Sequence, residues 1–128
     1  MSEQASSSTI NLAVVRGVAS GPPEVRHLVS GTRLATFAVR THAQGPPATS
    51  VPVVVWDPPA WVEQIDEDDE VLVAGSIRRR FYRAVSGGPA SRVELEATVI
   101  GRIPDGRAMR RARGLVTALG DALGDALA

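Results

Sequence analysis

The sequence has 128 residues, with 14 basic side chains, 14 acidic side chains and no cysteine. This length suits one domain with a single core. The lack of cysteine excludes disulfides and thiolate metal sites, and we expect neither a metal nor a cofactor. No apolar run reaches the roughly 18 residues of a membrane span. Residues 1–8 lack the features of a secretory signal and are expected to be a disordered lead-in to a cytoplasmic protein.

Charge is distributed unevenly along this neutral chain. Residues 57–70 carry seven acids and no base, whereas residues 71–113 carry ten arginines against three acids. A local basic surface is therefore possible without net charge. Every cation is arginine, which binds phosphate through two donors and stacks on bases, although codon bias would also explain that choice. The acidic run Asp66–Glu70 is interpreted as a solvated turn, because its spacing fits no defined calcium loop.

The first half of the chain is rich in β-branched and apolar residues. Gly17 lies inside a strand pattern and indicates a bulge or a bend. Alternation in the stretch around Phe37 and Val39 predicts that these two side chains face the core. The expected strands are Thr9–Ser20, a short extended piece Glu24–Leu28, Arg33–His42 and Val51–Trp56.

A short helix is expected next, with Asp57 as its N-cap and prolines in its first turn. The stretch Val71–Gly101 then reads as a long two-stranded hairpin whose turn is Ser86–Pro89. Its first arm places arginines beside two aromatic residues. Such a hairpin suits a strand of nucleic acid, because guanidinium groups meet phosphate and rings stack bases. An ordinary hairpin with a solvated basic edge remains the alternative.

The last segment, Asp105–Ala128, reads as a helix that Asp105 caps. Its apolar stripe at helical spacing should pack on the protein's own sheet, a second copy or another protein. The stripe consists of Met109, Ala112, Val116, Leu119, Leu123 and Ala126.

The order of these elements predicts an all-β protein. Five strands with a short helix between the third and the fourth is the plan of an OB-fold barrel, here with an appended C-terminal helix. Other small barrels fit the pattern alone. The expected division is a lead-in (1–8), an OB-fold domain (9–103) and a C-terminal amphipathic helix or tail (104–128).

The sequence also resembles a known family, the bacterial single-stranded DNA-binding proteins (SSB), over roughly residues 10–100. No single motif is specific to this family, but the set of motifs in this order is. The motifs are Asn11 and Gly17 in the first strand, Pro23-Glu24-Val25-Arg26, Ser30-Gly31-Thr32, Leu34-Ala35 with Phe37, Val53–Trp56, and Val71–Gly75 followed by Ile77, Arg78 and Arg80.

The resemblance implies a non-catalytic protein that wraps single-stranded DNA with low sequence specificity in DNA replication, recombination or repair. It also implies a nucleoid-associated homo-oligomer, a dimer or a tetramer. No membrane partner is expected, and the C-terminal helix offers a surface for a protein partner. The residues expected to bind nucleic acid are Arg40, Trp56, Arg78, Arg80, Phe81, Tyr82 and Arg83.

Each expected contact has a structural alternative. Trp56 fits the core of an apolar strand, and Phe81 and Tyr82 are strand neighbours, so one of them should pack inward. The loop Ala43–Ser50 lacks the aromatic residues that many members of the family carry there, so binding should be weaker. The second hypothesis is therefore an OB-fold protein-interaction or adaptor module that has lost most nucleic-acid binding.

Overall fold

The computed structural model describes residues 9–43, 45–103 and 106–127. The lead-in 1–8 and the expected cap Asp105 lie outside the described residues. In chain order the elements are β1 (Ala13–Ala19), β2 (Glu24–His27), β3 (Arg33–Thr41), β4 (Thr49–Trp56), the 3-10 helix η2 (Ala60–Gln64), β5 (Glu70–Arg83), β6 (Pro89–Arg102) and the helix α1 (Gly106–Leu127).

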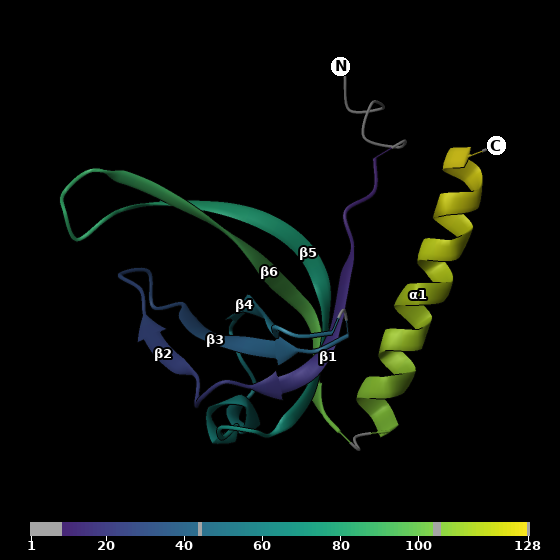
Figure 1. Ribbon diagram of the computed structural model, residues 1–128, viewed down its shortest axis with the longest axis horizontal. Coiled ribbons are helices and arrows are strands. Elements are labelled where there is room, and N and C mark those ends of the chain that lie inside the picture. Colours follow the sequence, from purple (N-terminus) through teal and green to yellow (C-terminus); the bar gives the residue numbers. More distant parts are fainter. Residues whose placement is uncertain (1–8, 44, 104–105, 128) are drawn as a thin grey trace.

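The strands form one sheet that closes into a ring (Figure 1). Its order is β1-β5-β6-β4-β3-β2, and an additional pairing of β1 with β3 closes it. All neighbours are antiparallel except β4 and β6, which are parallel. The short extended piece expected after β1 is β2, which forms a hairpin with β3. The mostly β architecture and the position of η2 between β4 and β5 agree with the order predicted from the sequence.

The core fills the inside of the ring. Phe37 and Val39 are buried there, as the alternation in β3 predicted. Val53 and Val55 of β4 and Leu95 of β6 point to the same interior. Successive side chains of a strand face opposite sides, so the residues between these positions form the outer face of the sheet.

The β5–β6 hairpin extends beyond the ring of strands on the side opposite α1 (Figure 1). We call this projecting part, residues 76–96, the arm. The register of β5 against β6 shifts between Ala74 and Gly75, and such a bulge bends a strand. The side chain of Asn11 fixes the root of the arm, because it donates to the Ile77 carbonyl and accepts from the Ile77 amide, both at 2.8 Å.

The short helix differs from the one expected. It begins after Pro59, which makes no side-chain capping bond, and it is a 3-10 helix. Asp57 is not its N-cap. Instead, the Asp57 amide donates to the Arg33 carbonyl at 2.9 Å and continues the pairing of β4 with β3. Its positive φ of 47° then turns the chain away from the sheet.

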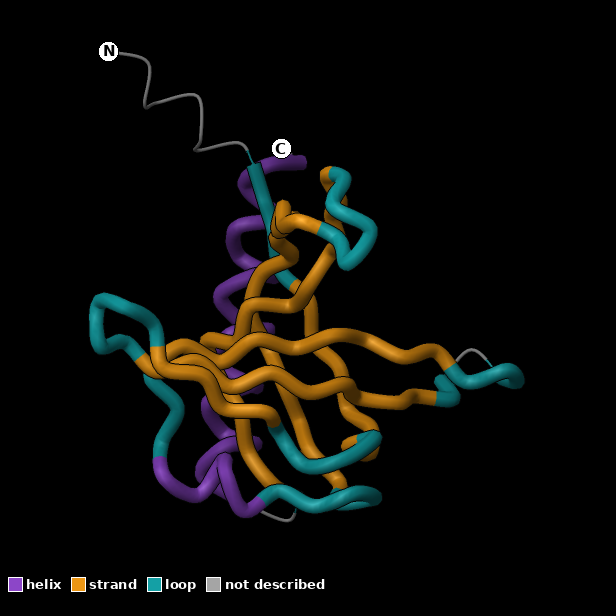
Figure 2. Tube along the Cα trace, turned by 90° about the vertical axis from the view of Figure 1, so that its left-hand side faces the viewer, coloured by secondary structure: helices purple, strands orange, loops and turns teal. Residues whose placement is uncertain are grey.

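The C-terminal helix predicted from the apolar spacing is present as α1, which contacts β5 and β6 and lies behind the strands in Figure 2. Leu115 and Leu119 are half-buried, whereas Val116 is exposed. Four residues of the predicted stripe have side chains outside the described set: Met109, Ala112, Leu123 and Ala126. Within the described residues, no helix is both long and apolar enough to cross a membrane.

Candidate nucleic-acid interface

A groove lies on the outer face of the sheet, between the arm and strands β2 to β4. It encloses a cavity of about 300 Å³. The residues that line this groove are Arg26, Leu28, Leu34, Val54, Trp56, Arg78, Arg79, Arg80, Glu94 and Glu96.

Strand register explains why residues distant in the sequence meet in the groove. Trp56 lies opposite Leu34 in the β3–β4 pair, and Val54 lies opposite Glu96 in the β4–β6 pair. Arg26 of β2 lies opposite Leu34 from the other side. Because these positions alternate with core residues on the same strands, their side chains share the outer face.

The arm contributes arginines and a ring to this face. Arg78, Arg80 and Tyr82 are spaced by two residues on β5 and therefore point to the same side. The Arg80 guanidinium carbon lies 5.5 Å from the centre of the Tyr82 ring, a cation–π distance. Trp56 is 44% exposed and Tyr82 is 41% exposed. Both rings are therefore open to a ligand.

Two carboxylates occupy the middle of the groove. The Trp56 indole Nε1 donates to Glu96 Oε2 at 2.7 Å, and Arg78 Nη1 donates to Glu96 Oε1 at 3.1 Å. Glu94 is only 4% exposed and accepts from Arg80 Nε at 3.1 Å and from Arg92 Nε at 2.8 Å. Burial of a charge requires such pairing. The groove arginines are thus partly neutralised by the protein itself.

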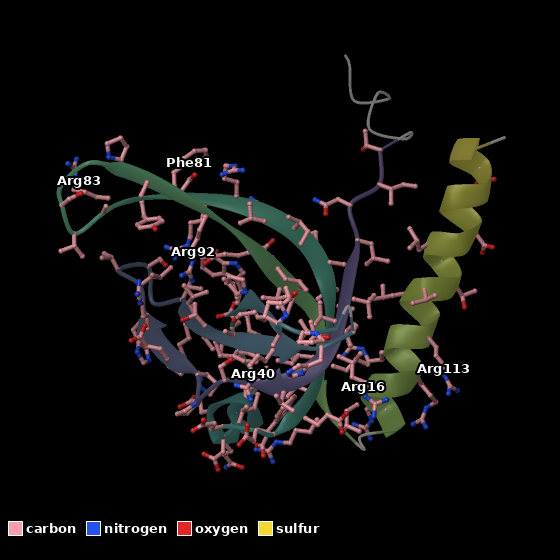
Figure 3. All side chains as sticks on the ribbon, in the orientation of Figure 1. Arg16, Arg40, Phe81, Arg83, Arg92 and Arg113 are labelled. Carbon is pink, nitrogen blue, oxygen red and sulfur yellow. The ribbon has the colours of Figure 1, made fainter. Side chains whose placement is uncertain are left out.

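Alternation along β5 places the remaining predicted arm residues, Phe81 and Arg83, on the opposite face. Arg83 Nη1 donates to the Gly87 carbonyl at 2.9 Å. Arg79, which also lines the groove, donates from Nη1 to Ser91 Oγ at 2.9 Å. Phe81 is 75% exposed, and its side chain points away from the closed sheet (Figure 3). Of the neighbours Phe81 and Tyr82, neither is buried. Near the hairpin tip these two rings, Arg83 and Pro89 line a second hollow.

Arg40 lies apart from the arm, near β1 and η2 (Figure 3). Its Nη2 donates to Asp68 Oδ1 at 3.0 Å, in the acidic turn before β5. The structure therefore brings together Trp56, Arg78, Arg80 and Tyr82, but it does not bring Arg40 to the same surface.

Several residues of this face were not among the predicted contacts. Seven of them line the groove, Arg26, Leu28, Leu34, Val54, Arg79, Glu94 and Glu96, and Arg92 pairs with Glu94 beside it. Strand alternation was the available signal for Leu34, since it lies one residue from the core position Ala35. Arg92 and Glu94 are two residues apart and point into the space beneath the arm. Only the β5–β6 register, which pairs Arg80 with Arg92, reveals this arrangement.

The groove combines apolar walls, the accessible indole of Trp56 and several guanidinium groups, and Tyr82 continues the same face of the arm beyond it. Such a surface holds planar groups by stacking and anions by hydrogen bonding. Among the described residues, no group of three or more histidine, cysteine or carboxylate side chains is placed to hold a metal ion.

No family model matches this chain, and no curated protein matches its sequence. Its fold is similar to that of the single-stranded DNA-binding protein from Thermus aquaticus, solved as a deletion mutant. The TM-score is 0.60 and the sequence identity is 18%. The match covers 73% of this chain and 40% of that protein. The likeness supports an SSB-like OB-fold.

Proposed function

We propose that this chain is an SSB-like OB-fold protein that binds single-stranded DNA without catalysis and with low sequence preference. The barrel consists of β1, β3, β4, β5 and β6, with β2 as an extension. The observation that carries the proposal is the grouping of Trp56 and Tyr82 with Arg78 and Arg80 on one outer face. DNA replication, recombination or repair is the proposed setting, in the cytoplasm at the nucleoid.

The chemistry of this face suits an unpaired strand. Bases of single-stranded DNA expose flat π-faces, and stacking on an aromatic side chain contributes about 1–3 kcal/mol per base. Guanidinium groups bind the backbone phosphates and release condensed counterions. Since these contacts use π-faces and phosphates rather than base edges, they give little sequence preference.

The carboxylates of Glu94 and Glu96 determine how strongly the groove is expected to bind DNA. A phosphate that approaches Arg78 or Arg80 competes with Glu96 or Glu94 for the same donors. The binding should therefore be weak at high salt and strengthen as salt is lowered.

Tryptophan fluorescence tests the proposal directly, because the two tryptophans occupy different environments. Trp56 is exposed in the groove. Trp61 packs against the core beneath Arg102, with the guanidinium carbon 5.9 Å from the indole centre. The variant Trp61→Phe leaves Trp56 as the single reporter, and oligo(dT) should quench its emission at low salt.

Trp56→Phe is the matched control, in which only Trp61 emits and little quenching is expected. An unchanged Trp56 emission with micromolar protein at low salt would refute the proposal. A duplex of the same length should quench less than oligo(dT), because its bases are already stacked on each other.

A protein-interaction or adaptor module is the second candidate function. The pairing of Arg78, Arg80 and Arg92 with Glu94 and Glu96 favours it, because paired cations attract phosphate less. This candidate predicts no response to oligo(dT) at any salt concentration. The same titration therefore separates the two functions.

A further inference from the structure

Helix α1 presents a second surface that the proposed DNA groove does not use. Leu115 and Leu119 are its half-buried side chains among those described, and the helix contacts β5 and β6. Val116 is 50% exposed. A side chain of this size, half exposed beside the packed face, leaves apolar surface open to another molecule.

A polar face borders Val116 on the side away from the sheet. Arg110, Arg113, Thr117, Asp121 and Gly124 follow one another at intervals of three, four, four and three residues. Residues at these intervals lie on one face of an α-helix. All five are exposed.

The charges of α1 are arranged against its own dipole. Arginines 110, 111 and 113 lie in the first half of the helix, and Asp121 and Asp125 lie in the second half. Cations near a helix N-terminus and anions near its C-terminus are both unfavourable. Within the described part of the chain, no ion pair joins these side chains to other residues.

An antiparallel neighbour with the same sequence reverses both disadvantages. It places its acidic half and the negative end of its dipole beside the basic half of the first helix. We propose that α1 pairs with α1 of a second copy of this chain, antiparallel, around a two-fold axis near Thr117.

One register brings Arg110 and Arg113 beside acidic residues of the partner helix. Arg113 and Asp121 each lie four residues from Thr117, so Arg113 faces the partner's Asp121. Arg110 lies seven residues from Thr117 and therefore faces the partner's Gly124, with the partner's Asp125 as the next residue. The two-fold axis repeats both pairs, as an isologous interface requires. Gly120 and Gly124 have no atom within 4 Å of an added Cβ, which leaves space for a close helix.

The position of α1 makes this pairing compatible with ligand binding. It lies on the side of the molecule opposite the arm (Figure 1), so a second copy on α1 leaves the groove open. The inference does not depend on the proposed function, and either can fail while the other holds.

Sedimentation of the full chain tests the pairing. The wild type should associate as a dimer, and Arg110→Glu with Arg113→Glu should weaken that association about tenfold or more, since it reverses four pairs. Asp121→Arg with Asp125→Arg should do the same. An equimolar mixture of the two double variants should associate again, because each supplies the charge that the other lacks.

Arg111→Glu is the matched control, because it changes the same charge on the same helix but lies away from the proposed contact face. Its sedimentation should resemble that of the wild type, and far-ultraviolet circular dichroism should report an equal helix content in every variant. A monomeric wild type overturns the proposal. So does a double variant that sediments as the wild type does, or a mixture that fails to associate.

Discussion

Glu96 controls how two groove side chains are presented. It accepts a hydrogen bond from the Trp56 indole and another from Arg78, so it orients the ring while it neutralises the cation. A ligand phosphate gains Arg78 only by displacing this carboxylate. At the scale of single residues, the affinity for DNA is therefore set by the acids of the groove as much as by its arginines.

Replacement of Glu96 by glutamine should tighten the binding of oligo(dT). The amide oxygen still accepts from the indole, but the competing negative charge is lost. We expect about fivefold higher affinity at low salt, the equivalent of about 1 kcal/mol for one exposed ion pair. Fluorescence anisotropy of a labelled oligonucleotide measures this change.

Glu67→Gln is the control for that substitution. It removes the same formal charge, but Glu67 is exposed in the acidic turn before β5. It should leave the affinity nearly unchanged. Equal effects of the two substitutions would mean that net charge, rather than the contact with Arg78, sets the affinity.

The bulge at Gly75 determines the direction of the arm at the scale of elements. A Cβ at this position would collide with the backbone carbonyl of Glu96 and press on the Thr98 amide. Only glycine allows β5 and β6 to approach so closely here.

Gly75→Ala should lower the free energy of unfolding by about 1–3 kcal/mol, because neither backbone contact can relax without moving a strand. Denaturant unfolding measures this loss. Gly21→Ala is the matched control, since a Cβ at Gly21 meets nothing within 4 Å and should cost little. Equal unfolding midpoints for the two variants would contradict the role given to Gly75.

Sequence patterns predicted most elements because each depends on local chemistry. Alternation identified the inward positions of β3, including Phe37 and Val39. Helical spacing identified α1. The cap assigned to Asp57 was wrong because the Asp57 amide bonds to Arg33, a partner more than 20 residues away in the chain, and no local pattern contains that partner.

Local sequence patterns also could not predict which carboxylates pair with the groove arginines. Glu94 meets Arg80 only because the hairpin register and its bulge align them. The basic segment predicted from charge counting lies partly on the arm and partly on α1, and the arginines of the arm bind different partners. Arg78 and Arg80 pair with Glu96 and Glu94, whereas Arg79 and Arg83 bond to Ser91 and to the Gly87 carbonyl.

At the scale of the whole molecule, a neutral protein must concentrate its positive charge to attract DNA. The acids of residues 57–70 lie largely around η2 and the turn before β5, where Asp68 and Glu70 pair with Arg40 and Arg16. The arm carries its arginines at the other side of the ring (Figure 3). This separation permits a local attraction that the net charge would not suggest.

The salt dependence of oligo(dT) binding tests the groove most directly. The wild type should be compared with Arg78→Ala/Arg80→Ala and with Arg16→Ala/Arg33→Ala, in which two arginines paired elsewhere are removed. The groove variant should lower the slope of log K against log salt by about 1.4, since each phosphate contact on a single strand contributes about 0.7. The control variant should keep the wild-type slope. Equal slopes for the two variants would contradict the groove as the DNA-binding surface.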